Sequence, residues 1–504
     1  MVKSFYYEVL NPVLQNIEKF ADRNAFCFSS EFYTYKDFGC CISQIAKKVE
    51  KAHFSNKLVG LVLNDDIETY SSIFALWMKG CCYVPLHCNW PIDRCLDICE
   101  QVGIDLILDS SENTRYQNTQ VVNTFNCHLD KCVTDLAFDS NVPENDLAYI
   151  LFTSGSTGKS KGVQLMRSNV ASFMVSFWKT GIKITEEDKC LQAFDLTFDV
   201  SVQNYLSALT RGACLYTIPY GKVKYLYAGN LMDEYGLTFA SMAPSMLKYL
   251  LRYIDELDFS NLKSLILTAE ACPIDLMEEW MKAVPTTTVY DFYGPTECTI
   301  YCTYYKLSNT GNPNKSCNGI ISIGKPLANC KGLILNENGE EVSHGEKGEL
   351  CIAGGHVCKG YWKNDEKNKE AFFEIEENGL MTRYYHTGDL VVEDKDGDIL
   401  YLGRIDNQAK IQGFRVELGE IEYHARQYLG GTSAVCIAFD NKEKLTELTL
   451  FIEAKEFDTK DLLDYMRSKM PSYMIPSKIL FVPVFPLNGN EKVDRKELAK
   501  LINK

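Results

Sequence analysis

The chain has 504 residues, of which 46% are hydrophobic and 24% charged, and its formal net charge is −15. These proportions are those of an ordinary globular protein and exclude a disordered or collagen-like class. The negative charge would repel a phosphate backbone, and no Lys/Arg stripe with interleaved aromatic residues offsets it, so we expect no nucleic-acid partner. Because a single hydrophobic core does not usually organise a chain of this length, we expect several packed subdomains.

The N-terminal segment Met1–Tyr7 contains no apolar stretch followed by a small-residue cleavage site. No run of about 18 apolar residues appears further along the chain, so we expect no membrane-spanning segment. We therefore expect a cytoplasmic protein.

The chain has 20 cysteines, and they are scattered, with adjacent pairs at Cys40–Cys41 and Cys81–Cys82. No paired C-x-x-C or Cys/His finger spacing is present, which argues against a disulfide framework or a zinc finger. We expect structural or free thiols.

Short, apolar, β-rich segments alternate with segments of helical periodicity. Four such strands are expected at Leu58–Leu63, Leu147–Thr153, Ser264–Thr268 and Thr287–Tyr290. A helix is expected after Ser168, because apolar residues recur there on one face, at Val170, Phe173, Met174 and Phe177. The alternation predicts an α/β fold with largely buried sheets.

A glycine-rich loop, Leu151–Gly162, lies between an expected strand and this helix. Glycine lets backbone N–H groups approach a polyphosphate closely, and hydroxyl and ammonium groups meet its charge. The loop is not a Walker motif, because Thr153 stands where that motif requires glycine. The alternative is a flexible surface turn. We expect nucleotide contacts from Thr153, Ser154, Gly155, Ser156, Thr157, Gly158 and Lys161.

Nine motifs follow one another along the chain: Tyr33–Phe38, Met78–Pro85, Leu151–Gly162, Phe198–Ser201, Tyr293–Glu297, Tyr385–Asp389, Gly403–Asp406, Lys410–Glu420 and Asn490–Arg495. In type and order they resemble those of the adenylate-forming superfamily, which includes acyl-CoA synthetases, luciferases and the adenylation domains of nonribosomal peptide synthetases. Within that superfamily the chain is most similar to stand-alone amino-acid-adenylating enzymes such as D-alanine–carrier-protein ligase.

The resemblance implies a large N-terminal domain of αβ-layered subdomains, residues 1–402, and a small mobile α+β domain, residues 403–504, with a hinge near Asp406. It also implies ATP-dependent adenylation followed by transfer to a phosphopantetheine thiol. The segment Leu429–Ser433 imitates a carrier attachment site but lies inside the small domain, and the short tail after Asn488 leaves no room for a carrier. We therefore expect the carrier to be a separate protein.

Adenylation joins a carboxylate to the α-phosphorus of ATP and releases pyrophosphate, so the site must neutralise phosphate charge. The resemblance assigns Mg²⁺ to Thr153 and Glu297, and assigns to Lys492 the bridging of carboxylate and phosphate oxygens. The family commonly has glycine before this lysine, where this chain has Glu491. The alternatives are a helix-start carboxylate for Glu297 and a solvated tail lysine for Lys492.

The resemblance also implies contacts to adenosine. Tyr293 would stack on adenine, Asp291 would accept the adenine amino protons, and Asp389 would hold the ribose hydroxyls. Arg404 would add a cation near the ribose and phosphate. Further nucleotide contacts are expected from Glu270 and Thr296. Without the resemblance, Asp389 would be interpreted as an ordinary turn aspartate.

Asp199 indicates the substrate class, because amino-acid-activating members of the family pair an aspartate at this position with the substrate ammonium group. A buried unpaired carboxylate would be costly, which favours an amino group in the ligand. The alternative is an N-cap of the helix through Gln203, which shares a face with Asp199. Aligning the motifs of this chain with those of the family also gives the expected substrate pocket. It consists of Asp199, Val200, Gln203, Ser241, Ile266, Thr268, Phe292, Ile300, Tyr301 and Lys492.

The identity of the amino acid stays open at this point. The expected pocket begins with Asp199, Val200 and Gln203, which resembles the start of the specificity code of proline-activating members of the family. The bulky side chains of Phe292 and Tyr301 suggest a small substrate. Proline, alanine of either hand and serine therefore remain candidates. Two other functions are considered: an acyl-CoA synthetase that uses free coenzyme A, and a non-catalytic scaffold homologue.

Overall fold

The computed structural model describes residues 4–129, 136, 143–154, 160–309, 313–405, 408–441, 443, 445–486 and 493–502. The chain divides into two compact units by its internal contacts. The first contains residues 1–88, 102–151 and 162–405, and the second contains residues 89–101, 152–161 and 406–504. The predicted domains, 1–402 and 403–504, stay predictions, and the expected hinge at Asp406 lies outside the described residues.

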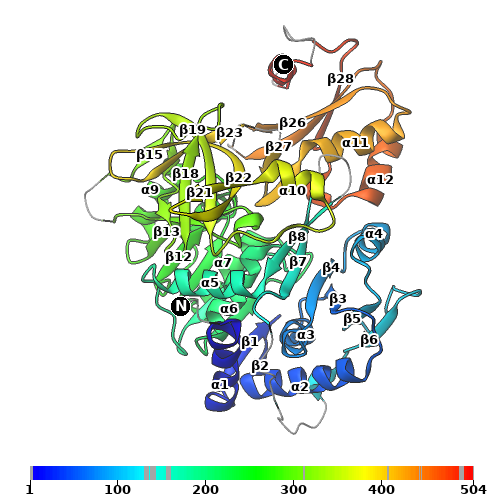
Figure 1. Ribbon diagram of the computed structural model, residues 1–504, viewed down its shortest axis with the longest axis vertical. Coiled ribbons are helices and arrows are strands. Elements are labelled where there is room, and N and C mark those ends of the chain that lie inside the picture. The colour runs from blue at the N-terminus through cyan, green and yellow to red at the C-terminus, as the bar shows by residue number, and fades with distance from the viewer. Residues whose placement is uncertain are drawn as a thin grey trace. The chain divides into compact units, whose positions relative to one another are not determined.

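The largest sheet has nine strands in the order β17-β14-β13-β12-β11-β9-β10-β1-β2. Figure 1 labels β1, β2, β12 and β13 of this sheet. Its inner strands are parallel, whereas the edge pairs β1–β2, β13–β14 and β14–β17 are antiparallel. Parallel inner strands are typical of an α/β layer covered by helices. The strands are β1 (Asn24–Phe28), β2 (Glu31–Thr34), β9 (Lys189–Gln192), β10 (Cys214–Thr217), β11 (Phe239–Met242), β12 (Ser264–Leu267), β13 (Thr288–Tyr293), β14 (Thr303–Lys306) and β17 (Lys325–Pro326).

A second sheet has seven strands in the order β20-β8-β7-β4-β3-β5-β6. The parallel pairing of β3 with both β4 and β5 forms its centre. The strands are β3 (Leu58–Leu63), β4 (Cys82–His87), β5 (Leu106–Asp109), β6 (Gln120–Asn123), β7 (Leu147–Thr153), β8 (Lys161–Met166) and β20 (Gly360–Tyr361). All four strands expected from the sequence are confirmed, as β3, β7, β12 and β13, with shifts of at most three residues at their ends.

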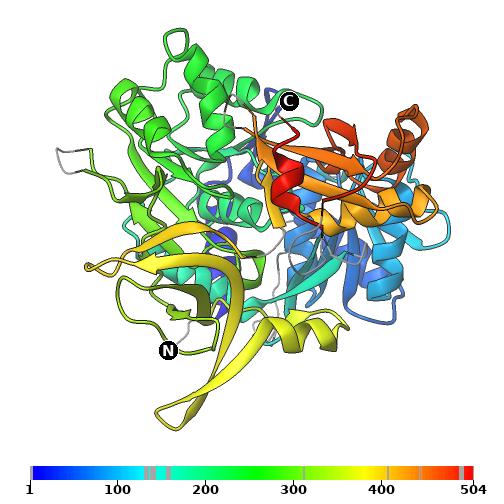
Figure 2. The same cartoon turned by 90° about the horizontal axis from the view of Figure 1, so that it is seen from above.

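A third, five-stranded sheet is antiparallel, with the order β18-β19-β22-β21 and with β23 paired to β22. In Figure 2 the yellow hairpin of β21 and β22 extends as a long curved ribbon. The strands are β18 (Cys330–Leu335), β19 (Lys347–Gly354), β21 (Phe372–Glu377), β22 (Leu380–Glu393) and β23 (Ile399–Arg404). A separate two-stranded ladder pairs β15 (Ser316–Cys317) with β16 (Ile320–Ile321).

Local chemistry accounts for several helix ends in the first unit. The Thr34 side chain accepts a hydrogen bond from the N–H of Asp37, and the Asp37 carboxylate accepts one from the N–H of Thr34, which caps α2. Gly236, with φ +61°, ends α7 in the left-handed conformation. The helices are η1 (Tyr6–Leu10), α1 (Asn11–Lys19), α2 (Tyr35–Lys51), α3 (Ile67–Met78), η2 (Cys127–Leu129), α5 (Arg167–Trp178), α6 (Asp199–Leu209), α7 (Lys224–Tyr235), α8 (Pro244–Leu250), η3 (Leu251–Tyr253), α9 (Ile274–Ala283), η4 (Thr296–Cys298) and α10 (Asp365–Ala371).

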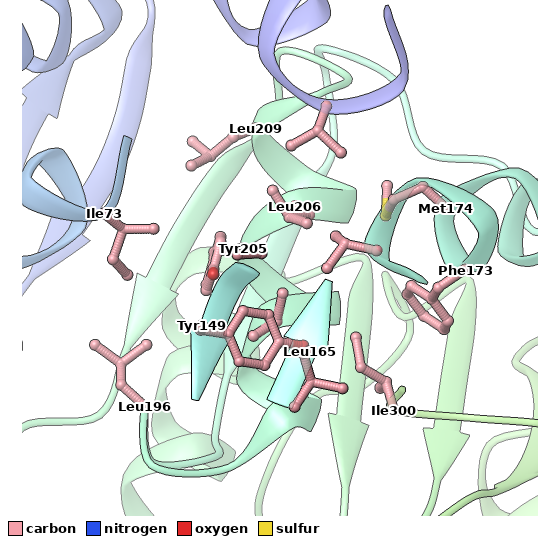
Figure 3. Packing of buried hydrophobic residues seen from close by; sticks show 14 of the residues in the cluster. Ile73, Tyr149, Leu165, Phe173, Met174, Leu196, Tyr205, Leu206, Leu209 and Ile300 are labelled. Atoms are coloured by element: carbon pink, nitrogen blue, oxygen red, sulfur yellow. The ribbon is translucent and has the colours of Figure 1, made fainter. Parts of the chain in front are cut away.

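The expected helix after the glycine-rich loop is confirmed as α5. Its four periodic residues, Val170, Phe173, Met174 and Phe177, have no exposed surface. Figure 3 shows Phe173 and Met174 in one cluster with Tyr149 of β7 and Leu165 of β8. Burying each such side chain contributes about 1.5–3 kcal/mol relative to leaving it in water. The core therefore fixes the segments that flank the loop.

The second unit contains a three-stranded sheet, β26-β27-β28, and a two-stranded ladder, β24-β25. Leu429–Ser433 forms the turn between α11 and β26, as expected. The elements are α4 (Ile92–Val102), β24 (Gln408–Ile411), β25 (Phe414–Glu417), α11 (Leu418–Tyr428), β26 (Ala434–Asp440), β27 (Thr446–Ile452), α12 (Lys460–Lys469), η5 (Ser472–Met474), β28 (Lys478–Phe481) and α13 (Arg495–Ala499).

Every cysteine in the described part of the chain is a free thiol, and most are buried, as expected; Cys132 lies outside that part. Among the described residues, no helix combines the length and the apolar character that crossing a membrane requires.

Candidate active site

Asp199 is the first residue of α6, and its side chain is buried. The backbone N–H of Ile300 donates a hydrogen bond of 3.3 Å to its carboxylate, and Thr296 and the N–H of Val200 also hydrogen-bond to it. No cationic side chain of the described residues pairs with it. Burial raises the pKa of Asp199 to about 6, because the ionised form loses its hydration. A ligand ammonium group would supply the missing cation.

The alternative interpretation of Asp199 as an N-cap is wrong. The N-cap of α6 is Phe198, which makes no side-chain cap hydrogen bond, and Asp199 lies one residue inside the helix. A carboxylate in the first turn still interacts favourably with the helix dipole. That interaction does not replace a charge partner.

The segment that holds Asp199 has an unusual backbone. Thr299 and Ile300 have φ values of +48° and +71°, a region that β-branched residues rarely adopt. Such conformations cost about 1–3 kcal/mol each and persist only where the surroundings enforce them. The Ile300 side chain is fully buried in the main core (Figure 3), and the Thr299 hydroxyl donates to the His356 carbonyl at 2.5 Å. Packing therefore fixes the N–H that binds Asp199.

One turn along α6, Gln203 is the centre of a buried polar network. Its Oε1 accepts hydrogen bonds from the Ser241 hydroxyl at 3.0 Å and the Tyr301 hydroxyl at 3.4 Å. Its Nε2 donates to Ser207 Oγ at 3.1 Å, and Tyr301 also hydrogen-bonds to Thr268. A satisfied buried network of this kind holds its members in one arrangement.

The remaining pocket residues of the first unit, Val200, Ile266, Phe292 and Ile300, are apolar. The ring centroids of Phe292 and Tyr301 are 4.9 Å apart. Val200 and Ile266 are buried in the main core. The structure thus brings the predicted substrate residues of the first unit into one neighbourhood, while Lys492 lies outside the described residues.

Three of the predicted adenosine residues, Tyr293, Asp389 and Arg404, also contact one another. The Tyr293 hydroxyl donates to Asp389 Oδ2 at 2.5 Å, and Arg404 forms an ion pair of 2.9 Å with Asp389 Oδ1. Asp389 and Arg404 are direct partners in the β22–β23 pairing. Asp291 and Tyr293 share one face of β13, whereas Phe292 points to the other. The strand therefore presents adenosine candidates on one face and a substrate candidate on the other.

Each of the two candidate metal ligands has a buried side-chain oxygen. Glu297, in η4, has no exposed surface, and the Tyr361 hydroxyl donates to its Oε1 at 2.6 Å. The Thr153 hydroxyl, at the end of β7, is buried without a hydrogen-bond partner among the described residues. A buried carboxylate and an orphaned hydroxyl are the hard oxygen donors that Mg²⁺ prefers. Each residue therefore has the chemistry of a magnesium ligand.

Two loop residues contact β25 within the second unit. The Ser154 hydroxyl accepts a hydrogen bond from the N–H of Glu417 at 2.8 Å and donates to the Arg415 carbonyl at 3.1 Å. Lys161 forms an ion pair of 2.9 Å with Glu417. The other predicted loop contacts, Gly155, Ser156, Thr157 and Gly158, lie outside the described residues.

Two predicted nucleotide residues have other partners in the structure. Glu270 accepts hydrogen bonds from the N–H and the hydroxyl of Ser245, both at 2.8 Å, at the start of α8. Thr296 hydrogen-bonds to the Asp199 carboxylate. Their roles toward a nucleotide stay predictions.

Comparison with known proteins places these groups in context. The sequence profile of the AMP-binding enzyme family matches residues 13–362. The chain belongs to the AMP-binding enzyme family. The predicted membership of the adenylate-forming superfamily and the predicted α/β fold of that superfamily are thereby confirmed.

Three relatives of this AMP-binding enzyme illustrate the family. Tyrocidine synthase 1 of Brevibacillus parabrevis is 30% identical over 501 residues, which covers 96% of this chain and 44% of that protein. Gramicidin S synthase 1 of Brevibacillus brevis is 30% identical over 512 residues, 96% of this chain and 44% of that protein. The chain thus spans less than half of these two relatives. Zwittermicin A synthase ZmaJ of Bacillus cereus is 31% identical over 510 residues, 97% of this chain and 94% of that protein.

Solved structures with the same fold include enzymes of different specificity. The Vibrio cholerae adenylation domain AlmE, in complex with glycyl-adenosine-5′-phosphate, has a TM-score of 0.84 and 23% identity and covers 98% of both chains. The o-succinylbenzoate CoA synthetase MenE of Bacillus subtilis has a TM-score of 0.80 and 21% identity, and covers 97% of this chain and 98% of that chain. At this identity the likeness defines the fold and leaves the acid substrate open.

Two residues of this AMP-binding enzyme were missed by the sequence analysis. His356 is fully buried; its Nδ1–H donates to the Tyr301 carbonyl at 2.8 Å, and its Nε2 lies 3.1 Å from Ser176 Oγ. Burial lowers the pKa of His356 to about 4, so the imidazole is neutral at pH 7. Tyr361, which holds Glu297, is the second. Neither lies in a motif that indicates chemistry, so only the fold identifies them.

Proposed function

We propose that this AMP-binding enzyme activates a small amino acid as an aminoacyl-adenylate and then transfers it to the phosphopantetheine thiol of a separate carrier protein. The observation that supports this most is the buried Asp199 carboxylate, which has only uncharged donors among the described residues. Leaving a carboxylate in this state costs free energy that an ammonium group would recover. An acid substrate without an amino group offers no such compensation.

The chain's own residues account for binding and orientation. Asp199 would pair with the α-ammonium group, and the Ile300 N–H would keep the carboxylate pointed toward it. Fixing one end of the amino acid aligns its carboxylate for attack, which lowers the entropic part of the barrier. Beside this point, the hydroxyls of Ser241 and Tyr301 and the Gln203 amide offer polar groups to the side chain.

A second group of residues would hold the nucleotide. Asp389, with two oxygens and a network to Tyr293 and Arg404, suits the two ribose hydroxyls. The substrate carboxylate oxygen forms a bond to the α-phosphorus while the bond from that phosphorus to the pyrophosphate oxygen breaks. Mg²⁺ bound by Glu297 and Thr153 would neutralise phosphate charge. Lys492, from the C-terminal domain, would bind the carboxylate and phosphate oxygens.

The side-chain specificity would favour a compact amino acid. Phe292 and Tyr301 are buried against each other, and Gln203 already accepts two hydrogen bonds. A long or charged side chain would have to break these contacts. Proline, alanine of either hand and serine are therefore the proposed substrates.

Pyrophosphate–ATP exchange measured with each of the twenty amino acids and with a panel of fatty and aryl acids tests the proposal. We expect exchange with one or a few small amino acids, lowered by about 10²–10⁴-fold in Asp199→Asn, because breaking a buried charge pair costs about 3–5 kcal/mol. Asp233→Asn, at an exposed aspartate of α7, is the matched control and should retain wild-type exchange.

The same screen distinguishes the other candidate functions. Exchange with fatty or aryl acids alone, unchanged in Asp199→Asn, would support an acyl-CoA synthetase, the activity for which the MenE protein is named. No exchange with any acid would support a non-catalytic homologue. Loading of a purified carrier protein, followed by intact-protein mass, then tests the second half-reaction and whether the carrier acts as a separate chain.

A further inference from the structure

Three metal-ligating side chains that the proposed reaction does not use lie together on the five-stranded sheet. They are Glu349 and Cys351 of β19 and His386 of β22. One ligand atom from each lies within 4.8 Å of the other two. His386 Nδ1 is 2.9 Å from Glu349 Oε2 and 3.5 Å from Cys351 Sγ.

These distances suit a common metal ion. For a tetrahedral Zn²⁺ with Zn–S of about 2.3 Å and Zn–N of about 2.05 Å, the sulfur and nitrogen ligands lie roughly 3.5 Å apart. The separation of Cys351 Sγ and His386 Nδ1 therefore requires no adjustment. Nitrogen and oxygen ligands lie roughly 3.3 Å apart in the same geometry, so Glu349 Oε2 would retreat by a few tenths of an ångström as its hydrogen bond to His386 is replaced.

The backbone holds the three side chains in place before any ion binds. Cys351 and His386 are direct partners in the antiparallel β19–β22 pairing. The other carboxylate oxygen of Glu349, Oε1, accepts a hydrogen bond of 2.8 Å from the N–H of Gly388. The ring of Phe373 lies 4.4 Å from the His386 ring, centroid to centroid. A carboxylate fixed by a second hydrogen bond is what outer-shell support of a metal ligand looks like.

The solvent exposure of the three side chains and the chemistry of their ligand atoms are also consistent with a bound metal ion. The side chains of His386 and Glu349 are 35% and 19% exposed, whereas Cys351 is buried in a small apolar cluster with Leu333 and Tyr384. An ion could therefore enter from the solvent side and meet the thiol at the inner side. A set of one sulfur, one imidazole nitrogen and one carboxylate oxygen is suited to a borderline cation such as Zn²⁺ and not to Mg²⁺ or Ca²⁺.

We propose that Glu349, Cys351 and His386 bind one Zn²⁺ ion, with water in the fourth position. Binding replaces the thiol proton, which is released to solvent, with a sulfur–zinc bond. Since Glu349 also holds the N–H of Gly388, the residue before Asp389, the ion would fix the turn that leads into the proposed ribose-binding carboxylate. The zinc site itself does not depend on the proposed substrate or on catalysis.

Zn²⁺ titration of the metal-stripped full-length protein, followed by calorimetry, tests this site. We expect one tight equivalent, which His386→Ala weakens by at least about 100-fold, since even an outer-shell change costs about 10–100-fold. His344→Ala is the matched control, because His344 pairs with Glu393 at the same 2.9 Å without a cysteine. Equal affinity in wild type and His386→Ala, or loss of binding in His344→Ala, would overturn the proposal.

Co²⁺ provides a second measurement that identifies the thiolate. Co²⁺ bound to the wild-type protein should produce a sulfur-to-metal charge-transfer absorption, and Cys351→Ala should lack it while keeping the wild-type thermal midpoint in the presence of chelator. The alanine preserves the apolar surroundings of the site. An unchanged cobalt spectrum in Cys351→Ala would rule out this cysteine as a ligand, whether or not the enzyme is active.

Discussion

The backbone N–H of Ile300 donates a hydrogen bond of 3.3 Å to the carboxylate of Asp199, which lies 101 residues earlier in the chain. The donor residue has a left-handed backbone conformation that isoleucine rarely adopts, and its side chain is fully buried. The carboxylate is thus oriented by neutral donors, and burial keeps its pKa at about 6. Both the geometry and the charge deficit favour a cationic ligand.

The first prediction concerns pH. Asp199 is protonated below its pKa of about 6 and ionised above it, and only the ionised form attracts an ammonium group. The affinity of the substrate-free enzyme for its amino acid should therefore fall about tenfold per pH unit below pH 6. Binding measured by calorimetry from pH 5 to pH 8 checks this.

Ionisation of Asp199 affects folding stability in the opposite direction: substrate affinity rises with pH, whereas the free energy of unfolding falls. Because the pKa of Asp199 is raised above its usual 3.8, the folded state binds more protons between about pH 4 and pH 6, and this residue lowers stability as pH rises through that window.

Asp199→Asn should bind amino acid weakly, and its affinity should not change at pH 6. A wild-type affinity that stays constant down to pH 5 would contradict the assignment.

Much of this arrangement could be predicted from the sequence. Leu58–Leu63 and Leu147–Thr153 are buried apolar runs, and burial on both faces makes such strands easy to recognise. Asp199 and Gln203 could be placed on one face because both lie on one helix. Local composition was sufficient for the two strands, whereas the choice of Asp199 and Gln203 as pocket residues came from the family resemblance.

Other features could not be predicted, for physical reasons. Nothing in the sequence around Thr299 and Ile300 indicates positive φ angles, since local preference opposes them and tertiary packing enforces them. His356 acts through contacts to residues 55 and 180 positions away. Cys351 and His386 meet only through the register of β19 and β22. Spacing rules detect neighbours in sequence, and these residues are neighbours only in the fold.

A second prediction follows from the close approach of Gly294 to the turn around Ile300. A Cβ at residue 294 would lie 2.5 Å from the Ile300 carbonyl oxygen and 2.6 Å from Tyr301 Cα, both backbone atoms. Gly294→Ala should displace the turn. The rate of pyrophosphate exchange should fall strongly, whereas the free energy of unfolding should fall only by the about 1–3 kcal/mol that overpacking costs. Gly332→Ala is the control, since its Cβ would meet a side-chain atom, Pro326 Cγ, at 3.3 Å. Equal exchange rates in the two variants would contradict the prediction.

A third prediction tests the metal role of Glu297. The Tyr361 hydroxyl orients the Glu297 carboxylate, so Tyr361→Phe should raise the Mg²⁺ concentration for half-maximal exchange by about 10–100-fold. Glu297→Gln should abolish most exchange at any Mg²⁺ concentration. Tyr384→Phe removes a comparable bond, 2.7 Å to Glu377, from the β21–β22 hairpin and should leave the Mg²⁺ dependence unchanged. A magnesium titration of exchange in the three variants decides the matter, and an identical response of both tyrosine variants would argue against this role.

The last prediction concerns His356, whose imidazole is neutral and fully buried beside Tyr301. Its pKa of about 4 in the folded state lies below the usual 6.5, so the unfolded state binds more protons between these values and stability falls as pH drops through that window. Between pH 7 and pH 5 this residue alone should account for about 2 kcal/mol of lost stability. His356→Gln should therefore lose less stability than wild type over the same interval, although it starts from a lower value. Urea unfolding at the two pH values measures the difference, and His344→Ala, at a side chain that is 70% exposed, should behave as wild type. A His356→Gln protein as acid-sensitive as wild type would show that other groups control the acid transition.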